Sequence, residues 1–344
     1  MNMKFVDLQK EYLFFQDQIN AAFDTVKNSG RYLFGEQVEA LEFEFAKLIG
    51  VKNAVAVGNG TEALYLVISH LHKLAMPILL PNFGAYPTAV ACRYVTDNLI
   101  YVDVNASMTI DPQKLPKDVK NGILVGVHLF GNNCDMPAIM KYAKVNNHIV
   151  VEDCAQSTGS GSGNIGDYSI FSFYPTKPLS AMGDGGMICS NMDLSYFKKA
   201  RFYGVDDNIL GLNSRMDEFQ AAIVRAKMPY FQILNDRRIA TGNYYKTFVS
   251  GIRVNSKSVF HQFTVNFDQR DLIIKKLGRI PYMIHYPKHV NEIPVLKSRN
   301  KSIVGCRVSD TIISLPVHPY LTDEEVSEVG DFLYANREAE IQEF

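Results

Sequence analysis

Apolar residues near the start of the chain recur at spacings of three and four positions, which is the period of an amphipathic helix. Gly30 follows the first of these runs and Gly50 follows the second, and glycine commonly ends helices. The sequence therefore predicts two helices, each with one face packed on the core. Their apolar positions are Leu8, Tyr12, Phe15, Ile19, Phe23 and Val26 in the first, and Val38, Leu41, Phe45 and Leu48 in the second.

Short apolar runs follow, and they alternate with helical or loop segments. Runs of this length, bounded by turn residues, predict buried strands. Strands that alternate with helices form parallel sheets with right-handed crossovers, so we expect an α/β domain with a mostly parallel central sheet flanked by helices. The predicted strands are residues 54–57, 78–81, 98–104, 122–129, 149–151 and 168–174, and predicted helices open at Thr61, at Ser195 and just after Asn213.

The pattern changes at about residue 235, after which β-like runs and helices no longer alternate regularly. We therefore expect a large domain over residues 1–235 and a smaller α+β C-terminal domain over residues 236–344. The last helix opens with Thr322 and Glu325 in the register of a capping box. The other predicted elements of this part are a helix over 237–249 and strands over 260–267, 282–286 and 311–315.

The composition is that of an ordinary globular protein, with 47% hydrophobic and 21% charged residues. The 35 Lys and Arg residues nearly balance the 36 Asp and Glu residues, which argues against binding to nucleic acid or a membrane surface. The chain shows no signal peptide and no apolar stretch long enough to cross a bilayer, so we expect a cytoplasmic protein. The five cysteines never form a CxxC pair, so we expect reduced thiols and no metal site: Cys92, Cys134, Cys154, Cys189 and Cys306.

The side chains best suited to catalysis lie within residues 150–186. Asp153 follows a buried strand, and ligands of open α/β sheets collect beyond the carboxyl ends of the strands. Lys177 lies just after the apolar run that holds Ser172, on a segment without helical or strand period, and desolvation there would make its amine a Schiff-base nucleophile. Taken singly, the commoner roles are a surface charge for Lys177, a cap or ion-pair partner for Asp153 and a strand hydroxyl for Ser172.

The turn Gly58-Asn59-Gly60 joins the first predicted strand to the helix that opens at Thr61. Free backbone N–H groups and the positive end of a helix point outward from such a turn, so it suits a phosphate group. Many turns of this kind bind nothing. The spacing fits neither a Walker A loop nor a dinucleotide fingerprint, which disfavours an ATPase or an NAD enzyme.

Read in order, the segments VEDCAQ, FSFYPTK and GDGG closely resemble the signature of the DegT/DnrJ/EryC1/StrS aminotransferases, the sugar aminotransferases of pyridoxal phosphate (PLP) fold type I. The resemblance implies that Lys177 binds the PLP aldehyde as a Schiff base and that Asp153 meets the ring nitrogen. It also implies that Gln156 hydrogen-bonds the ring oxygen of the cofactor or orients Asp153.

The same resemblance assigns further cofactor contacts. The phosphate is expected at Gly60 and Thr61, with Ser172 among its donors. An aromatic residue of the segment NFGAYPTA is expected to stack on the pyridine ring. Tyr86 is the candidate. Phe83 is the alternative, because the local sequence is offset by about one residue from the motif that is usual in the family.

Partner and substrate residues are also implied by the resemblance. Asn213 is expected to help hold the PLP phosphate of a neighbouring subunit, which implies a homodimer with shared active sites. Without the resemblance, an ordinary helix N-cap is an equally good role for Asn213. Arg31, Tyr32, His285 and Tyr286 are expected to line the substrate site, although a solvated loop or core packing would explain them as well.

The implied activity is transfer of an amino group from L-glutamate, which leaves as 2-oxoglutarate, to a dTDP- or UDP-linked 3-keto or 4-keto deoxysugar. The product would serve lipopolysaccharide O-antigen or another glycoconjugate. A keto-cyclitol substrate and a non-catalytic PLP-binding regulatory protein are the alternatives, and Lys177 argues against relatives that carry histidine there and catalyse dehydration. The sequence departs from the family pattern in two places that concern access of the substrate. The span from Asp153 to Lys177 is 24 residues (177 minus 153), which is shorter than in most relatives, and Pro178 stands where relatives usually carry asparagine.

Overall fold

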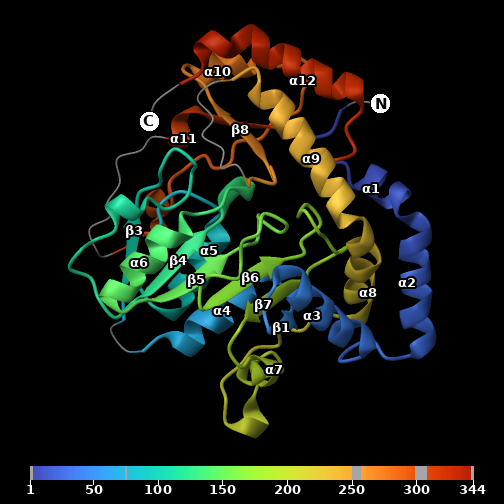
Figure 1. Ribbon diagram of the computed structural model, residues 1–344, viewed down its shortest axis with the longest axis vertical. Helices are drawn as coiled ribbons and strands as arrows, with labels where there is room; N and C mark the ends of the chain where they lie inside the picture. Colours follow the sequence, from blue (N-terminus) through green and yellow to red (C-terminus); the bar gives the residue numbers. More distant parts are fainter. Residues whose placement is uncertain (1–2, 74–75, 250–256, 299–307, 342–344) are drawn as a thin grey trace.

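A seven-stranded sheet forms the centre of the larger part of the molecule in the computed structural model, which describes residues 3–73, 76–249, 257–298 and 308–341 (Figure 1). The strand order is β1-β7-β6-β5-β4-β2-β3, and only β7 runs antiparallel to its neighbours. The mostly parallel sheet predicted from the sequence is therefore confirmed. The strands are β1 Asn53–Val57, β2 Ile78–Pro81, β3 Leu99–Val102, β4 Ile123–Val127, β5 Ile149–Asp153, β6 Tyr168–Ser172 and β7 Gly186–Ser190.

Helices cover both faces of this sheet, which explains why its strands read as continuous apolar runs. Alternate residues of one strand enter different cores, so that Val55 packs with α4 and α5 while Ala54 packs with α3 and α8. The helices of this part are α1 Leu8–Phe14, α2 Gln16–Ser29, α3 Glu36–Ile49, α4 Gly60–Leu71, α5 Tyr86–Val95, α6 Met136–Asn146, α7 Ser195–Ala200 and α8 Glu218–Lys227. The described chain contains no helix with the length and hydrophobicity needed to span a bilayer.

The predicted helix ends at Gly30 and Gly50 are confirmed, because both glycines adopt the left-handed conformation that stops a helix. The first predicted helix is nevertheless two helices. Phe15 leaves helical geometry between α1 and α2, and its buried ring packs edge-on against Tyr230. Asn213 does not cap α8, since Asp217 does so by accepting a hydrogen bond from the backbone of Gln220.

A two-stranded antiparallel sheet, β8 with β9, organises the C-terminal part and has its own apolar core. The predicted strand over residues 282–286 is wrong, because only Met283 pairs there, as an isolated bridge to Ser314. The capping box of Thr322 and Glu325 is confirmed. The elements are α9 Phe231–Lys246, β8 Phe263–Asn266, α10 Arg270–Ile274, α11 Val308–Thr311, β9 Ile312–Leu315 and α12 Asp323–Asn336.

The boundary predicted at residue 235 lies inside α9, a continuous helix that begins six residues before the helix expected at residue 237 (237 minus 231). The chain therefore enters its C-terminal part through a helix and not through a linker. The division into two domains stays a proposal. Short 3₁₀ turns complete the described chain: Pro112–Lys114, Leu129–Gly131, Val205–Asp207, Met228–Tyr230, Val290–Glu292, Pro294–Leu296 and Arg337–Ala339.

Candidate active site

A cavity of about 580 Å³ opens at the carboxyl edge of the central sheet. Because β1, β5 and β6 point the same way and β7 runs against them, their ends and the start of β7 meet at one edge. Side chains from strand ends, from the beginning of α4 and from the following loops line the cavity. Six residues singled out in the sequence lie together there: Gly60, Thr61, Asp153, Gln156, Ser172 and Lys177.

Lys177 sits on a compact turn. Its own N–H donates to the carbonyl of Tyr174 at 2.8 Å, and the N–H of Ala181 donates to the carbonyl of Phe173 at 2.7 Å. Burial lowers the pKa of the Lys177 amine to about 8, although the negative charge of Asp153 acts in the opposite direction. An appreciable fraction of the amine is therefore neutral near pH 7 and able to act as a nucleophile or a base.

Asp153 ends β5 and is 5% exposed. The hydroxyl of Thr88 donates to its Oδ2 at 2.6 Å, and the N–H of Ala155 donates to its Oδ1 at 3.1 Å. Each carboxylate oxygen keeps a lone pair for a further donor, such as a protonated ring nitrogen. Sequence reasoning missed Thr88, whose only signal was a hydroxyl residue among alanines and a cysteine on the buried face of α5.

The start of α4 has the features of an anion site. Asn59 caps the helix by accepting from the N–H of Glu62 at 2.9 Å, and among the described residues no acceptor meets the N–H of Gly60 or Thr61. Ser172 lies beside them, and its Oγ accepts from the N–H of Tyr174 at 3.3 Å, which leaves its proton free to donate. Two backbone donors, a hydroxyl and a helix N-terminus together suit a phosphate.

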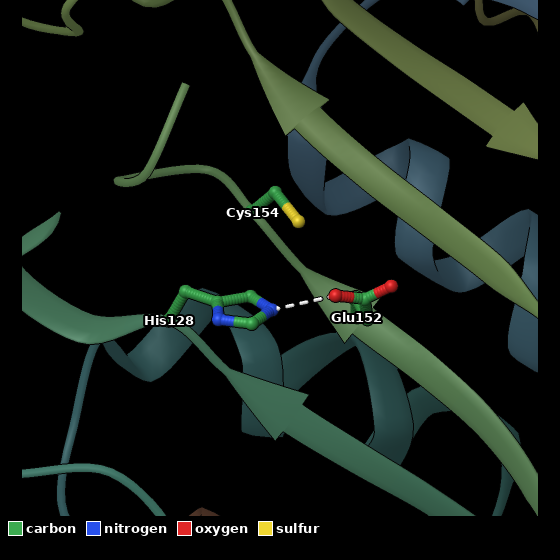
Figure 2. A group of neighbouring side chains, drawn as sticks. All are labelled: His128, Glu152 and Cys154. Atoms are coloured by element: carbon green, nitrogen blue, oxygen red, sulfur yellow. Dashed lines mark hydrogen bonds and ion pairs between the residues drawn. The ribbon is translucent and has the colours of Figure 1, made fainter. Parts of the chain in front are cut away.

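Behind Asp153, a buried network joins His128 to Glu152, with Cys154 nearby (Figure 2). His128 Nδ1 accepts from the N–H of Cys134 at 3.0 Å, so the proton is on Nε2, which donates to Glu152 Oε2 at 3.0 Å. The carboxylate also accepts from the backbone N–H groups of Gly163, Ile165 and Gly166.

These hydrogen bonds hold the pKa of Glu152 below its usual range, although burial acts in the opposite direction. Three donors from one loop and one from His128 occupy the four lone-pair positions of the carboxylate. Neither the imidazole nor the carboxylate has a lone pair left for a metal ion. The network is therefore structural, and it fixes the end of β5 on which Asp153 is held.

Gln156 connects the cavity to the C-terminal part of the chain. Its Nε2 donates to the hydroxyl of Tyr286 at 3.1 Å, and its Oε1 accepts from the N–H of Phe130 at 2.8 Å. His285 lies 2.9 Å from the hydroxyl of Ser314, and burial together with the charge of Lys177 lowers its pKa to about 4. Tyr286 and His285 thus lie next to cavity residues, and His285 is neutral at physiological pH.

The two candidate stacking aromatics do not line the cavity. Phe83 is 1% exposed and packs in the core, whereas the Tyr86 hydroxyl donates to the carbonyl of Lys288 at 3.3 Å. Ala85 and Pro87 line the cavity from this segment. Ring stacking by Tyr86 or by Phe83 stays a prediction.

Three other predicted residues lie outside the cavity of their own chain. Arg31 and Tyr32 are exposed on the loop between α2 and α3, where the Tyr32 ring stacks on Phe219 at 5.5 Å. Asn213 is also exposed, and it pairs as an isolated bridge with Phe202. Their roles toward substrate or a partner subunit stay predictions.

The mostly parallel seven-stranded sheet and the likeness of nearly the whole chain to solved aminotransferases define a PLP enzyme of fold type I. The sequence profile of the DegT/DnrJ/EryC1/StrS aminotransferase family matches residues 15–334. The chain belongs to this family, and it is an aminotransferase.

Named relatives are similar over nearly their whole length. The UDP-N-acetyl-3-dehydro-alpha-D-glucosamine 3-aminotransferase of Acidithiobacillus ferrooxidans is 31% identical, over 94% of this chain and 95% of its own. The dTDP-3-amino-3,6-dideoxy-alpha-D-galactopyranose transaminase of Aneurinibacillus thermoaerophilus is 32% identical, over 94% and 97%. The crystal structure of S. venezuelae DesV in complex with a ketimine intermediate superimposes with a TM-score of 0.89 at 28% identity, covering 97% of this chain and 98% of that one.

Proposed function

We propose that this enzyme transfers the amino group of L-glutamate to carbon 3 of a UDP- or dTDP-linked 3-keto sugar. The observation that carries the proposal is the meeting of Lys177, Asp153 and the anion site at α4 in one cavity. The activities of two relatives, both concerned with 3-amino sugars on UDP or dTDP, support the substrate class.

PLP, when bound, supplies an electron sink that stabilises negative charge developing on the substrate carbon. The donor set fits this cofactor. Asp153 has lone pairs directed away from Thr88 and Ala155 with which it would hold the ring nitrogen. The N–H groups of Gly60 and Thr61 would hold the phosphate.

Lys177 would first hold the cofactor covalently and would then move the proton. Its amine, with a pKa of about 8, takes a proton from the substrate carbon when neutral and returns one when charged. The hydrogen bond from Gln156 to the Tyr286 hydroxyl joins the wall of the cavity to the C-terminal part of the chain. The same residues serve both halves of the reaction, because amino donor and keto acceptor use the site in turn.

A keto-cyclitol substrate or a non-catalytic regulatory role is not favoured, because the relatives named above act on nucleotide sugars and the reactive lysine is present. We also propose that the protein is a cytoplasmic homodimer that serves surface polysaccharide synthesis, such as that of lipopolysaccharide O-antigen. Exposed Asn213 and the exposed apolar side chains around it support a subunit contact there. These side chains are Phe202, Tyr203, Val205 and Leu210.

The test begins with borohydride reduction of the holoprotein and mass spectrometry of its peptides. We expect the cofactor mass on Lys177, and an adduct on another lysine would refute the assignment. In a separate sample that has not been reduced, L-glutamate should bleach the cofactor absorbance and release one equivalent of 2-oxoglutarate per site. Screening the aminated enzyme against UDP- and dTDP-linked 3-keto and 4-keto sugars decides the acceptor, and exclusive reaction with a 4-keto sugar would contradict the proposal.

Two variants complete this test. Lys177→Ala should abolish turnover without changing the fold, as judged by circular dichroism. Asp153→Asn should keep the cofactor but lose most activity, because an amide stabilises the protonated ring nitrogen far less than a carboxylate does. Full turnover in the Lys177→Ala variant is incompatible with the proposal.

A further inference from the structure

A second, smaller cavity adjoins the turn that carries Lys177. Its volume of about 40 Å³ gives room for roughly three water-sized groups at ~10–15 Å³ each. The N-terminal segment, α9 and the chain after β9 form its walls, through residues such as Phe5, Arg238 and Val317. Figure 1 shows the beginning of the chain passing beside α9. Among the described residues, Lys177 alone lines both this cavity and the larger one that contains Asp153.

Arg238 faces this cavity without a counter-ion. The residue is 7% exposed, and its Nη1 donates to Asn235 Oδ1 at 3.1 Å. Within the described part of the chain, no carboxylate lies within ion-pair distance of the guanidinium, and no acceptor meets its Nε or Nη2. A buried guanidinium without an anion is costly, so the arrangement is suited to receive one.

Burial lowers the pKa of the Arg238 guanidinium to about 10, and the negative charge of Glu11 acts in the opposite direction without forming an ion pair with it. The single carboxylate of its wall, Glu11, is held by Lys227 Nζ at 2.5 Å and by the hydroxyl of Ser180 at 3.0 Å. Burial and then the positive charges of Lys177 and Arg238 lower the pKa of His261 well below its usual range, so that ring is neutral. The Arg238 guanidinium therefore lies beside the Lys177 amine with no ion-pair partner of its own in the described chain, and the space before it attracts anions.

We propose that this cavity binds the side-chain carboxylate of the dicarboxylic amino donor, with Arg238 as its ion-pair partner. The inference deepens the proposed function and rests on it. The α-carboxylate of the donor is attached to the reacting carbon and stays in the cavity of Asp153, whereas the side-chain carboxylate can extend past Lys177. A guanidinium fork matches a carboxylate through two parallel hydrogen bonds, and the three heavy atoms of a carboxylate match the size of the cavity.

A nucleotide diphosphate shares the same anionic chemistry, but it is larger than a cavity of about 40 Å³. The experiment distinguishes the carboxylate of the amino donor from the diphosphate of a nucleotide. Arg237, the next residue of α9, offers a matched control because it is exposed and donates only to the carbonyl of Leu321. Arg238→Gln removes the charge, and Arg238→Lys keeps a charge but lacks the fork.

The first measurement uses glutarate, which has two carboxylates and no amine and therefore cannot react. Glutarate at millimolar concentration should raise the melting temperature of the holoenzyme and of Arg237→Gln, but not that of Arg238→Gln. UDP should stabilise all three proteins alike. Equal stabilisation of Arg238→Gln by glutarate, or none of the parent enzyme, would overturn the inference. This readout does not depend on transamination, so its failure is distinguishable from failure of the proposed function.

The second measurement is the single-turnover bleaching of the cofactor by L-glutamate. The dissociation constant for L-glutamate should rise roughly 10- to 100-fold in Arg238→Gln, the loss typical of a charged hydrogen bond, and less in Arg238→Lys. The dissociation constant for the nucleotide-linked keto sugar should change less than about threefold, as expected for a group it does not contact. If Arg238→Gln does not fold, Arg238→Lys carries the test. A larger loss for the nucleotide sugar than for L-glutamate would assign Arg238 to the diphosphate and refute the proposal.

Discussion

At the scale of single residues, the site depends on how a few polar atoms are paired. Asp153 can accept a further hydrogen bond, as its proposed role requires, because Thr88 and Ala155 each donate to one of its oxygens and leave the remaining lone pairs free. The proposed roles of Lys177 need a neutral amine, and burial disfavours its charged form. Both effects come from neighbours that are distant in sequence, and each can be tested by changing one group.

Thr88→Val should weaken cofactor binding, because the substitution keeps the size of the side chain but removes the donor to Asp153. A charged hydrogen bond is worth about 1.5–3 kcal/mol, so we expect the PLP dissociation constant to rise roughly 10-fold or more. Equilibrium titration of the apoenzyme measures it. Thr88→Ser keeps the hydroxyl and serves as the control. Unchanged affinity in Thr88→Val would show that the hydroxyl does not support Asp153.

The Lys177 amine should titrate near pH 8 in the apoenzyme and near 10.5 when the chain is unfolded in urea. Acetylation of its peptide by acetic anhydride should therefore increase with pH up to about 8 and then level off in the folded protein only. Because the unfolded chain binds this proton more tightly, the apoenzyme should gain stability as pH rises from about 8 to 10.5. A folded-state midpoint near 10.5 would contradict the desolvated amine.

At the scale of elements, the anion site depends on how closely β7 approaches the start of α4. Gly186 begins β7, and a Cβ built there would lie 2.4 Å from the carbonyl carbon of Asn59 and 2.7 Å from the nitrogen of Gly60. Such distances require the backbone to move. A strand glycine thus allows the helix N-terminus to reach the edge where the strands end.

Gly186→Ala should displace the turn that presents the N–H groups of Gly60 and Thr61. A backbone shift of this kind costs about 1–3 kcal/mol, which corresponds to roughly 5- to 150-fold weaker PLP binding. Gly126→Ala in β4 is the matched control, since its Cβ would meet Cys134 at an ordinary 3.6 Å. Fluorescence titration with PLP compares the two variants. Similar affinities would show that the close approach is not needed.

At the scale of the whole molecule, the predicted subunit contact decides whether one chain makes a complete site. Asn213 lies outside its own cavity, while Ser214 next to it accepts from the N–H of Gly58 at 3.0 Å. The segment therefore runs beside the anion site of its own chain and ends on an exposed surface. Exposed Leu210 and Val205 extend this surface.

Mixing two inactive variants tests the shared site. If Asn213 serves the neighbouring subunit, a heterodimer of Lys177→Ala and Asn213→Ala contains one site with both residues intact. We expect up to about a quarter of the parent activity after random reassortment of subunits, since half of the dimers are mixed and each has one good site. Verified heterodimers without any activity would exclude this geometry, and monomers at working concentration in sedimentation would exclude the dimer.

The sequence by itself determined the alternation of strands and helices, because buried parallel strands need apolar runs and helix ends need glycine or a cap. It also predicted the polar residues that meet in the cavity, since Asp153 and Ser172 lie at the ends of neighbouring strands and Lys177 lies on the turn that follows. Only the tertiary structure decided what surrounds them. The break at Phe15, the hydrogen bond from Thr88 and the unpaired Arg238 arise from contacts between distant segments, and no local pattern encodes which distant groups will pack together or how far each will be removed from water.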